Sequence, residues 1–294
     1  MIKALELFSG IGAFAEAAGK QNIEVVAAYD QDPRANWTYA LNHKLKPNPR
    51  NLDTIASKDL PAADLWWMSP PCQPYSVRGN QKGLRDPRAR SLINLLDHLK
   101  DHRPRVFMLE NVSGFLGSDA HEMVAETLRN LDYQCQVIEL SPTAFGVPMR
   151  RPRLYLVATK SGVTFEAPEL KTQSAIKLET FVTHSFSDDL IVLSSDFDKY
   201  APSLHIIKPG DSDAYAICFT SGYWKSFKSA GTFIEVEKGK IRRFSPEEII
   251  SLMGFSADFV FPESLPLQAK LQLAGNTVDV RAIDYILNGL ANLD

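Results

Sequence analysis

The chain contains little cysteine and no long hydrophobic run. Its 294 residues include three cysteines, which stand far apart at positions 72, 135 and 218. An odd and scattered set of this kind argues against a disulfide framework and a CxxC metal site, and it indicates a reducing compartment. The apolar stretches are too short for a membrane span, and no signal-peptide pattern begins the sequence. We therefore expect a cytoplasmic protein that uses no metal ion and no membrane.

The sequence also lacks repeats, low-complexity tracts and an excess of one charge. Lys and Arg number 32 against 35 Asp and Glu, so the net charge of −3 gives no general attraction to nucleic acid. Basic residues nevertheless gather within residues 78–90, 150–153 and 225–243. A solvated surface explains any one such group. Three groups that flank candidate site segments are more suggestive of an anionic partner.

The first half of the chain alternates between apolar runs and segments of helical period. Strands are predicted at 4–8, 25–29, 65–68, 106–109 and 134–140, and helices at 14–20, 33–42, 91–101 and 120–131. A further strand is expected at 154–157. This alternation predicts an α/β fold with a doubly wound, mostly parallel sheet.

Beyond residue 161 the apolar pieces become short and irregular, which indicates a separate small lobe. We predict a catalytic domain over 1–161, the lobe over 162–265 and a C-terminal segment over 266–294 that returns to the first domain. Ser245, Pro246 and Glu248 match the N-cap, N1 and N3 positions of a capped helix. A strand or loop is expected around Gly275 and Asn276, with a helix after it.

Cys72 is the most informative single residue. It lies in Met68-Ser69-Pro70-Pro71-Cys72-Gln73, where prolines end an apolar run and lead the chain stiffly away from the strand. A loop at the carboxyl end of a parallel strand is where open α/β sheets bind ligands. Cys72 is therefore a candidate nucleophile, and a buried structural thiol is the alternative.

A glycine turn follows the first predicted strand. Gly10 and Gly12 stand between that strand and a helix, an arrangement that lets a ligand approach backbone amides. Asp30 ends the next strand, where a carboxylate can accept both hydroxyls of a ribose. Ala15 replaces the third glycine of GxGxxG. An adenosine-containing cofactor fits, with NAD and S-adenosylmethionine both open and a merely tight turn as the alternative.

Glu110 ends another apolar strand and is expected to face the same crevice as Cys72. A thiol nucleophile with a carboxylic acid suits addition to an electron-poor ring, because the acid can hold or protonate a ring nitrogen. A capping or salt-bridging glutamate is the alternative. Arg150, Arg151 and Arg153 precede a strand and can position a phosphate, a base edge or a loop, or they form a surface cluster.

Taken in order, these segments resemble the cytosine-5 methyltransferases of nucleic acids over almost the entire chain. The matching segments are residues 8–12 (FSGIG), 71–73 (PCQ), 110–112 (ENV), 151–153 (RPR), 242–254 and 275–278 (GNTV). Cys218-Phe219-Thr220, followed by Gly222-Tyr223, resembles the signature of the branch that methylates tRNA. The resemblance implies a class I, Rossmann-like S-adenosylmethionine-dependent fold with a target-recognition lobe. Met149 and Tyr75 depart from the Gln and Phe usual at these positions.

The resemblance also implies roles for individual residues. Cys72 would add to C6 of cytosine, so that C5 takes the methyl group of S-adenosylmethionine, while Glu110 contacts the N3 and N4 edge of the base. Arg151 and Arg153 would support the catalytic loop and the target base. The residues implied in the cofactor pocket are Phe8, Ser9, Gly10, Gly12, Asp30, Asp53, Pro71, Asn276 and Thr277. Those expected at the substrate are Arg78, Lys82, Cys218, Phe219, Thr220, Lys225 and Lys228.

We therefore predict C5-methylation of a cytosine in the anticodon loop of a tRNA, of the position-38 type. The same chemistry on duplex DNA is the alternative, disfavoured because a small lobe and a negative net charge offer little to wrap around a duplex. A silent nucleic-acid-binding module and a nicotinamide-dependent oxidoreductase are further alternatives. The sequence does not determine the oligomeric state, for which a monomer is the default expectation.

Overall fold

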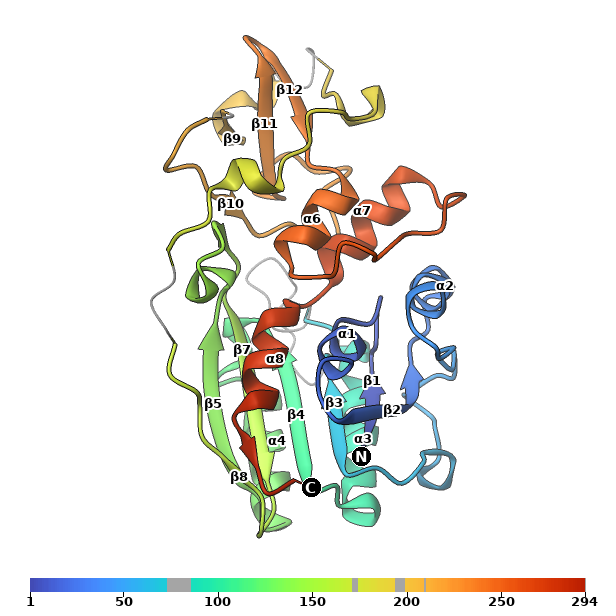
Figure 1. Ribbon diagram of the computed structural model, residues 1–294. Helices are drawn as coiled ribbons and strands as arrows, with labels where there is room; N and C mark the ends of the chain where they lie inside the picture. The colour runs from blue at the N-terminus through green and yellow to red at the C-terminus, as the bar shows by residue number, and fades with distance from the viewer. Residues whose placement is uncertain (73–85, 171–173, 194–198, 209, 294) are drawn as a thin grey trace. The chain divides into compact units, whose positions relative to one another are not determined.

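The computed structural model describes residues 1–72, 86–170, 174–193, 199–208 and 210–293. The chain divides into two compact units, which are coloured along the sequence in Figure 1. Unit 1 comprises Met1–Leu140, Pro152–Glu169 and Ala282–Asp294, and unit 2 comprises Ser141–Arg151 and Leu170–Arg281.

Unit 1 is built on a six-stranded sheet with the order β2-β1-β3-β4-β7-β5. Its strands are β1 (Ile2–Leu7), β2 (Ile23–Tyr29), β3 (Leu65–Met68), β4 (Val106–Asn111), β5 (Gln134–Leu140) and β7 (Arg153–Thr159). The first four strands pair in parallel, whereas β7 runs antiparallel to both β4 and β5. The mostly parallel sheet predicted from the sequence is therefore confirmed. A two-stranded sheet joins β8 (Thr164–Phe165) to β13 (Leu290–Ala291).

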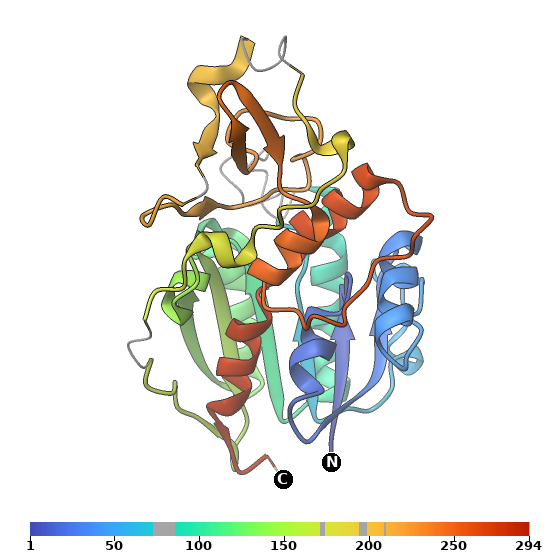
Figure 2. The same cartoon turned by 45° about the horizontal axis from the view of Figure 1, so that its top comes forward.

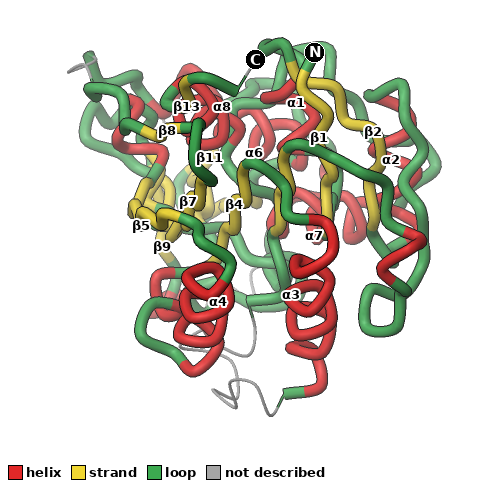
Figure 3. Tube along the Cα trace, turned by 90° about the horizontal axis from the view of Figure 1, so that it is seen from below, coloured by secondary structure: helices red, strands yellow, loops and turns green. Residues whose placement is uncertain are grey.

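Helices cover both faces of this sheet, as Figures 2 and 3 show for α3 and α4 on one face and α1 and α8 on the other. The helices are α1 (Ala13–Ala18), α2 (Pro33–Asn42), α3 (Arg90–His102), α4 (Asp119–Asn130) and α8 (Val280–Asn288), with short 3₁₀ turns at Ser57–Asp59, Pro87–Ala89 and Ser113–Phe115. Strands β3 and β4 are buried along their whole length, as expected where helices cover both faces. The ring of Phe14 on α1 stacks on Trp67 of β3 with centroids 5.4 Å apart. The doubly wound arrangement is confirmed.

Unit 2 consists of shorter pieces. A three-stranded sheet has the order β12-β11-β9, and a second pair joins β6 to β10. The elements are β6 (Met149–Arg150), β9 (His205–Ile207), β10 (Ala216–Ile217), β11 (Thr232–Glu237), β12 (Lys240–Arg243), α6 (Pro246–Leu252) and α7 (Leu267–Asn276), with 3₁₀ turns at Pro142–Phe145, Leu178–Phe181, Asp188–Leu190 and Ala201–Ser203. The predicted cap of α6 is confirmed, because Ser245 and Glu248 form a reciprocal capping box.

One expectation was wrong: Gly275 and Asn276 lie in helix α7, not in a strand or loop. A Cβ atom on Gly275 would lie 2.5 Å from the carbonyl oxygen of Thr220. Glycine is therefore needed here for the close approach of two backbones inside a helix, and it does not mark a turn. The helix expected after it is present as α8.

Candidate active site

The turn between β1 and α1 is held in an uncommon backbone conformation. Phe8, Gly10 and Gly12 have φ values of +59°, +54° and +95°. Such values are costly for a residue with a side chain, so Phe8 marks local strain of the kind that concentrates at functional sites. A Cβ atom on Gly10 would meet nothing within 4 Å, whereas one on Gly12 would lie 2.5 Å from His43 Nε2. Gly10 thus leaves its backbone approachable, and Gly12 permits tight packing.

The carboxylate of Asp30 links this turn to the end of β2 through a hydrogen bond. Its Oδ2 accepts a hydrogen bond of 2.8 Å from the Gly10 amide, and its Oδ1 accepts one of 2.8 Å from the Asp32 amide. Burial raises the pKa of the Asp30 carboxyl, and the two amide hydrogen bonds partly offset that rise. Each carboxylate oxygen has a further lone pair, so contact with ribose hydroxyls is still open.

Asp53 and Ser9 lie in the same unit. The half-buried Asp53 accepts a hydrogen bond from the hydroxyl of Ser91 in α3, which ties the segment before β3 to that helix. The Ser9 amide donates to the carbonyl of Tyr29 at 2.9 Å, and the residue is buried. Hydrogen bonds therefore join Ser9, Gly10 and Asp30 at the ends of β1 and β2, whereas Asp53 is joined to α3.

The segment that carries Cys72 is fixed to the end of the neighbouring strand. Met68 of β3 pairs with Leu109 of β4, and the chain then continues through two prolines to a half-buried Cys72. The side-chain amide of Asn111, itself 1% exposed, donates to the Pro70 carbonyl oxygen at 3.2 Å. The two strand ends thus meet at one edge of the sheet, as the parallel arrangement predicts.

Glu110 is held from two directions at that edge. The Ser69 hydroxyl donates to its Oε2 at 2.7 Å, and Arg153 Nε on β7 lies 3.3 Å from its Oε1. The carboxylate is buried, and a buried charge is tolerated only with such partners. Sequence reasoning missed Ser69 and Asn111, although each immediately adjoins a strand-end residue that it singled out. The alternative of a salt-bridged glutamate is also satisfied by this geometry.

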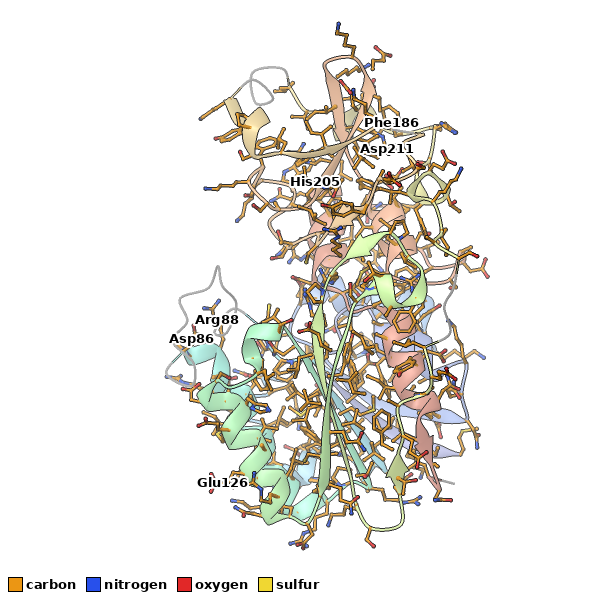
Figure 4. All side chains as sticks on the ribbon, turned by 90° about the vertical axis from the view of Figure 1, so that its left-hand side faces the viewer. Asp86, Arg88, Glu126, Phe186, His205 and Asp211 are labelled. Carbon is orange, nitrogen blue, oxygen red and sulfur yellow. The ribbon has the colours of Figure 1, made fainter. Side chains whose placement is uncertain are left out.

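Arg88 belongs to the basic group at residues 78–90, but the sequence assigns it no role of its own. It donates to both oxygens of Asp86, from Nε at 2.9 Å and from Nη2 at 2.6 Å, at the start of α3 (Figure 4). The pKa of Arg88 is raised, first by hydrogen bonding to Asp86 and to a smaller extent by the charge of Cys72. The Asp-Pro-Arg pattern, in which Asp86 caps the turn that carries Arg88, is the signal in the sequence that could have revealed this pair.

The two predicted arginines have different partners. Arg153 belongs to unit 1 and pairs with Glu110. Arg151 belongs to unit 2 and is 5% exposed. Its guanidinium donates hydrogen bonds of 2.7 Å to the carbonyl oxygens of Phe219 and Thr277. Cys218 Sγ lies 3.0 Å and the Gly275 carbonyl oxygen 3.3 Å from the same guanidinium. Arg151 thereby joins the Cys-Phe-Thr segment to the end of α7.

The other substrate residues predicted in unit 2 divide into buried and exposed ones. Phe219 is 1% exposed, and its ring packs against Tyr223 and Phe244 in the core of unit 2. Thr220 is half-buried, with its hydroxyl 3.3 Å from the Ala230 carbonyl. The exposed side chains are those of Lys225, Lys228 and Asn276, whereas Thr277 is buried. Arg78, Lys82 and Tyr75 lie outside the described residues.

None of the helices in the described ranges has the length and apolar character needed to cross a bilayer. Within the same ranges, His, Cys, Asp and Glu side chains form no group of three or more that could hold a metal ion.

Comparison with known proteins places this arrangement in context. The sequence matches the C-5 cytosine-specific DNA methylases over residues 2–292. It is 30% identical to the tRNA (cytosine(38)-C(5))-methyltransferase of Schizosaccharomyces pombe, over 98% of this chain and 96% of that protein. It is 25% identical to a DNA (cytosine-5)-methyltransferase of Dictyostelium discoideum, over 99% and 94% of the two chains.

The fold is likewise similar to a solved structure. The crystal structure of S. pombe Dnmt2 methyltransferase superimposes with a TM-score of 0.87 at 27% identity, over 98% of this chain and 97% of that one. The resemblance predicted from the sequence motifs is therefore confirmed. Because the match extends through both units, the chain belongs to the C-5 cytosine-specific DNA methylase family, whose members are S-adenosylmethionine-dependent methyltransferases.

Proposed function

We propose that this protein transfers the methyl group of S-adenosylmethionine to C5 of a cytosine in the anticodon loop of a tRNA. The observation that carries the chemistry is the joined edge of β3 and β4, where Ser69 and Asn111 connect the Cys72 segment to the Glu110 segment. The relatives that bear the tRNA methyltransferase name support the choice of substrate. The position-38 cytosine in their names is the one we assign here.

The residues of unit 1 fit an adenosine-containing cofactor. Gly10 has open space where a side chain would stand, so a ligand can reach the backbone of the turn, and the Asp30 carboxylate lies directly behind it. Phe8, Ser9, Gly12, Asp53 and Pro71 complete the proposed pocket from this unit, and the cofactor roles of Asn276 and Thr277 stay predictions of the resemblance. When bound, S-adenosylmethionine supplies an electrophilic methyl group, which the side chains at the sheet edge cannot provide.

The proposed role of Cys72 is nucleophilic. Its thiolate forms a bond to C6 of cytosine, and the C5=C6 electron pair then makes C5 a nucleophile toward the methyl group. Loss of the C5 proton to a base restores the double bond and expels the thiolate, so the enzyme is regenerated.

Glu110 is proposed to hold the base. Its carboxylate accepts hydrogen bonds from the N4 amino group and from a protonated N3, which stabilises the electron density that moves into the ring on thiolate addition. Ser69 and Arg153 occupy the other lone pairs of Glu110 and fix its orientation, so we regard both as positioning residues. The proposed role of Arg151 is to keep the Cys-Phe-Thr segment in place through its hydrogen bonds to the Phe219 and Thr277 carbonyls.

Unit 2 is proposed as the target-recognition part of the molecule, extending the lobe predicted over residues 162–265. Chemistry on C6 requires an unstacked base, and loops of tRNA present such bases without the cost of opening a duplex. The exposed Lys225 and Lys228 are proposed to contact phosphates, as are Arg78 and Lys82. Cys218 and Thr220 are proposed to take part through the Cys-Phe-Thr segment to which they belong.

The test is transfer of labelled methyl from S-adenosylmethionine to total tRNA and, in parallel, to genomic DNA. We expect label in tRNA alone, with bisulfite sequencing locating it at one anticodon-loop cytosine. Label confined to DNA would establish the alternative, which the DNA methyltransferase among the relatives favours. Absence of label from both would overturn the proposal. RNA carrying 5-fluorocytosine tests the covalent step, because fluorine blocks the final elimination and traps the Cys72 peptide.

A further inference from the structure

A pocket in unit 2 combines aromatic and charged side chains that the proposed chemistry does not use. Its volume is about 480 Å³. The lining side chains that matter here are Tyr200, Trp224, Phe227, Lys225, Arg243 and Asp189. Only Lys225 among them was expected at the substrate. The proposed methyl transfer therefore does not account for this pocket.

The cationic side chain of Arg243 holds two of these aromatic rings in place. The guanidinium carbon of Arg243 lies 5.1 Å from the ring centre of Trp224 and 5.0 Å from that of Phe227. Its Nη2 also donates to the Trp224 carbonyl at 2.9 Å. Tyr200 stacks on Phe227 with ring centroids 5.0 Å apart and an angle of 14°. These contacts orient the rings before any ligand arrives, which lowers the entropy that binding must overcome.

The same rings remain partly accessible. Tyr200, Trp224 and Phe227 are all half-buried, in contrast to the fully buried rings of the unit 2 core such as Tyr223 and Phe233. The rim carries an exposed lysine, Lys225, and an exposed carboxylate, Asp189. Aromatic faces bordered by a cation are how proteins hold single-stranded nucleic acid, because bases stack on the rings while the cation meets the backbone.

We propose that this pocket binds one unstacked base of the RNA substrate, other than the cytosine that is methylated. Trp224 provides the stacking surface, Lys225 contacts a phosphate of the same nucleotide, and Asp189 accepts a hydrogen bond from an amino or imino group of the base. Because a carboxylate repels phosphate, Asp189 also fixes which end of the nucleotide enters. The proposal rests on the proposed tRNA substrate and names a second contact within it.

Tryptophan fluorescence gives a direct readout. The chain has four tryptophans, and besides Trp224 the accessible one is Trp37, at 49% exposure, since Trp66 and Trp67 are buried. In a Trp37→Phe protein, titration with tRNA should quench the emission of Trp224 as a base stacks on it. Double-stranded RNA and duplex DNA of the same mass should quench far less, because their bases are already stacked.

Substitutions separate stacking from folding. Trp224→Leu keeps an apolar side chain but removes the aromatic face, and we expect it to raise the Kd for tRNA on the order of 10-fold. Trp224→Phe should restore most of the affinity. Trp37→Leu is the matched control and should leave the Kd unchanged. Binding of S-adenosylhomocysteine, measured in parallel, should be the same in all three if the fold is intact.

Salt dependence tests Lys225. Lys225→Gln should flatten the slope of log K against log salt by about 0.7, the value for one phosphate contact on a single strand, whereas Trp224→Leu should leave that slope unchanged. Unchanged tRNA affinity in Trp224→Leu, with tRNA still methylated, would overturn the pocket and leave the proposed function standing. Failure of the unsubstituted protein to bind or methylate tRNA would overturn both. Quenching by duplex DNA and not by tRNA would also reject an RNA pocket.

Discussion

The two units position their polar groups by different means. In unit 1 a continuous six-stranded sheet brings strand ends together, and short hydrogen bonds such as Ser69 to Glu110 complete the arrangement. In unit 2 the sheets are small, and buried arginines connect segments that are distant in the sequence. Arg242, 1% exposed, donates to both oxygens of Glu248 at 2.8 Å and to the Thr183 carbonyl at 3.1 Å.

This difference predicts a difference in response to mutation. A backbone ladder survives the loss of one side chain, so substitutions at the sheet edge of unit 1 should remove chemistry and leave the fold. Removal of a buried arginine leaves several acceptors without a donor, so substitutions in unit 2 should destabilise the fold first. The predictions that follow test this contrast.

The largest effect is expected for Cys72→Ala. Turnover should be abolished, because no other group in the proposed mechanism forms the bond to C6, while the thermal stability and cofactor binding stay unchanged. S-adenosylhomocysteine at about 100 times its Kd should stabilise wild type and variant alike by about 2.7 kcal/mol. Substantial remaining activity, or a trapped peptide that contains Cys135 or Cys218, would show that the mechanism is wrong.

Glu110→Gln comes next. An amide keeps the shape but cannot accept two charge-assisted hydrogen bonds, so kcat should fall by roughly 10²- to 10⁴-fold with little change in stability. Ser69→Ala should act in the same direction and more weakly, because Arg153 still holds the carboxylate. Single-turnover methyl transfer to tRNA measures both. An unchanged kcat in Glu110→Gln would remove this residue from the chemistry.

Arg151 and Arg153 stand in one motif but belong to different units, so substituting each of them tests the contrast between the units. Arg151→Met should destabilise the protein by about 1–3 kcal/mol for each acceptor that loses its donor, since the guanidinium bonds to carbonyls of both Phe219 and Thr277. Arg153→Met leaves the buried Glu110 carboxylate with Ser69 as its remaining partner in this pair of contacts, so it should lower the urea midpoint less than Arg151→Met and should also lower kcat. Equal stability of the two variants would contradict the division of roles between the units.

The sequence predicted those features that depend on local pattern. Strands β3 and β5 and helix α2 begin and end at the predicted residues, because an apolar run, an alternating run and a helix cap are each patterns of consecutive residues. The capping box of α6 is another such feature. Convergence of Cys72 and Glu110 at one edge also follows from the sequence, since it needs only neighbouring parallel strands.

Features that depend on distant contacts were beyond the sequence. Gly275 lies in a helix because the backbone of Thr220 passes it, and a Gly-Asn pair would otherwise indicate a turn. Phe219 belongs to a recognition motif but packs in the core. Arg151 and Arg153 diverge because the chain crosses from one unit to the other between residues 151 and 152. Each of these features depends on a contact with a segment that is distant in the sequence, so a local sequence pattern does not predict it.

Gly10 in unit 1 and Gly275 in unit 2 extend the comparison of the two units to the backbone. Gly275→Ala should cost about 1–3 kcal/mol, because the new methyl group would collide with the Thr220 backbone. Gly10→Ala should cost about 1–2 kcal/mol for a different reason, its φ of +54° in open space. Asparagine, which tolerates positive φ, should therefore partly rescue position 10 and worsen position 275. Chemical denaturation of the four variants measures this, and rescue at both positions would contradict the assignment.

The last effect concerns pH and belongs to unit 1. Glu6 on β1 is completely buried, and its Oε2 accepts a hydrogen bond of 2.8 Å from the Tyr39 hydroxyl. Burial raises its pKa from 4.5 to about 8, against the lowering effect of Tyr39 and of backbone amides at the start of α1. The native state therefore holds a proton that the unfolded chain has released across this interval.

Stability from Glu6 should thus be fully present below pH 4.5 and lost as the pH rises toward about 8. The free energy of unfolding should fall by up to about 1.4 kcal/mol for each pH unit in that window. Glu6→Gln, which cannot ionise, should flatten this slope when unfolding is followed from pH 5 to 8. Glu126→Gln is the matched control, because Glu126 is exposed on α4 (Figure 4), and it should keep the wild-type slope. A slope in Glu6→Gln equal to that of wild type would show that Glu6 is already ionised in the folded protein at neutral pH.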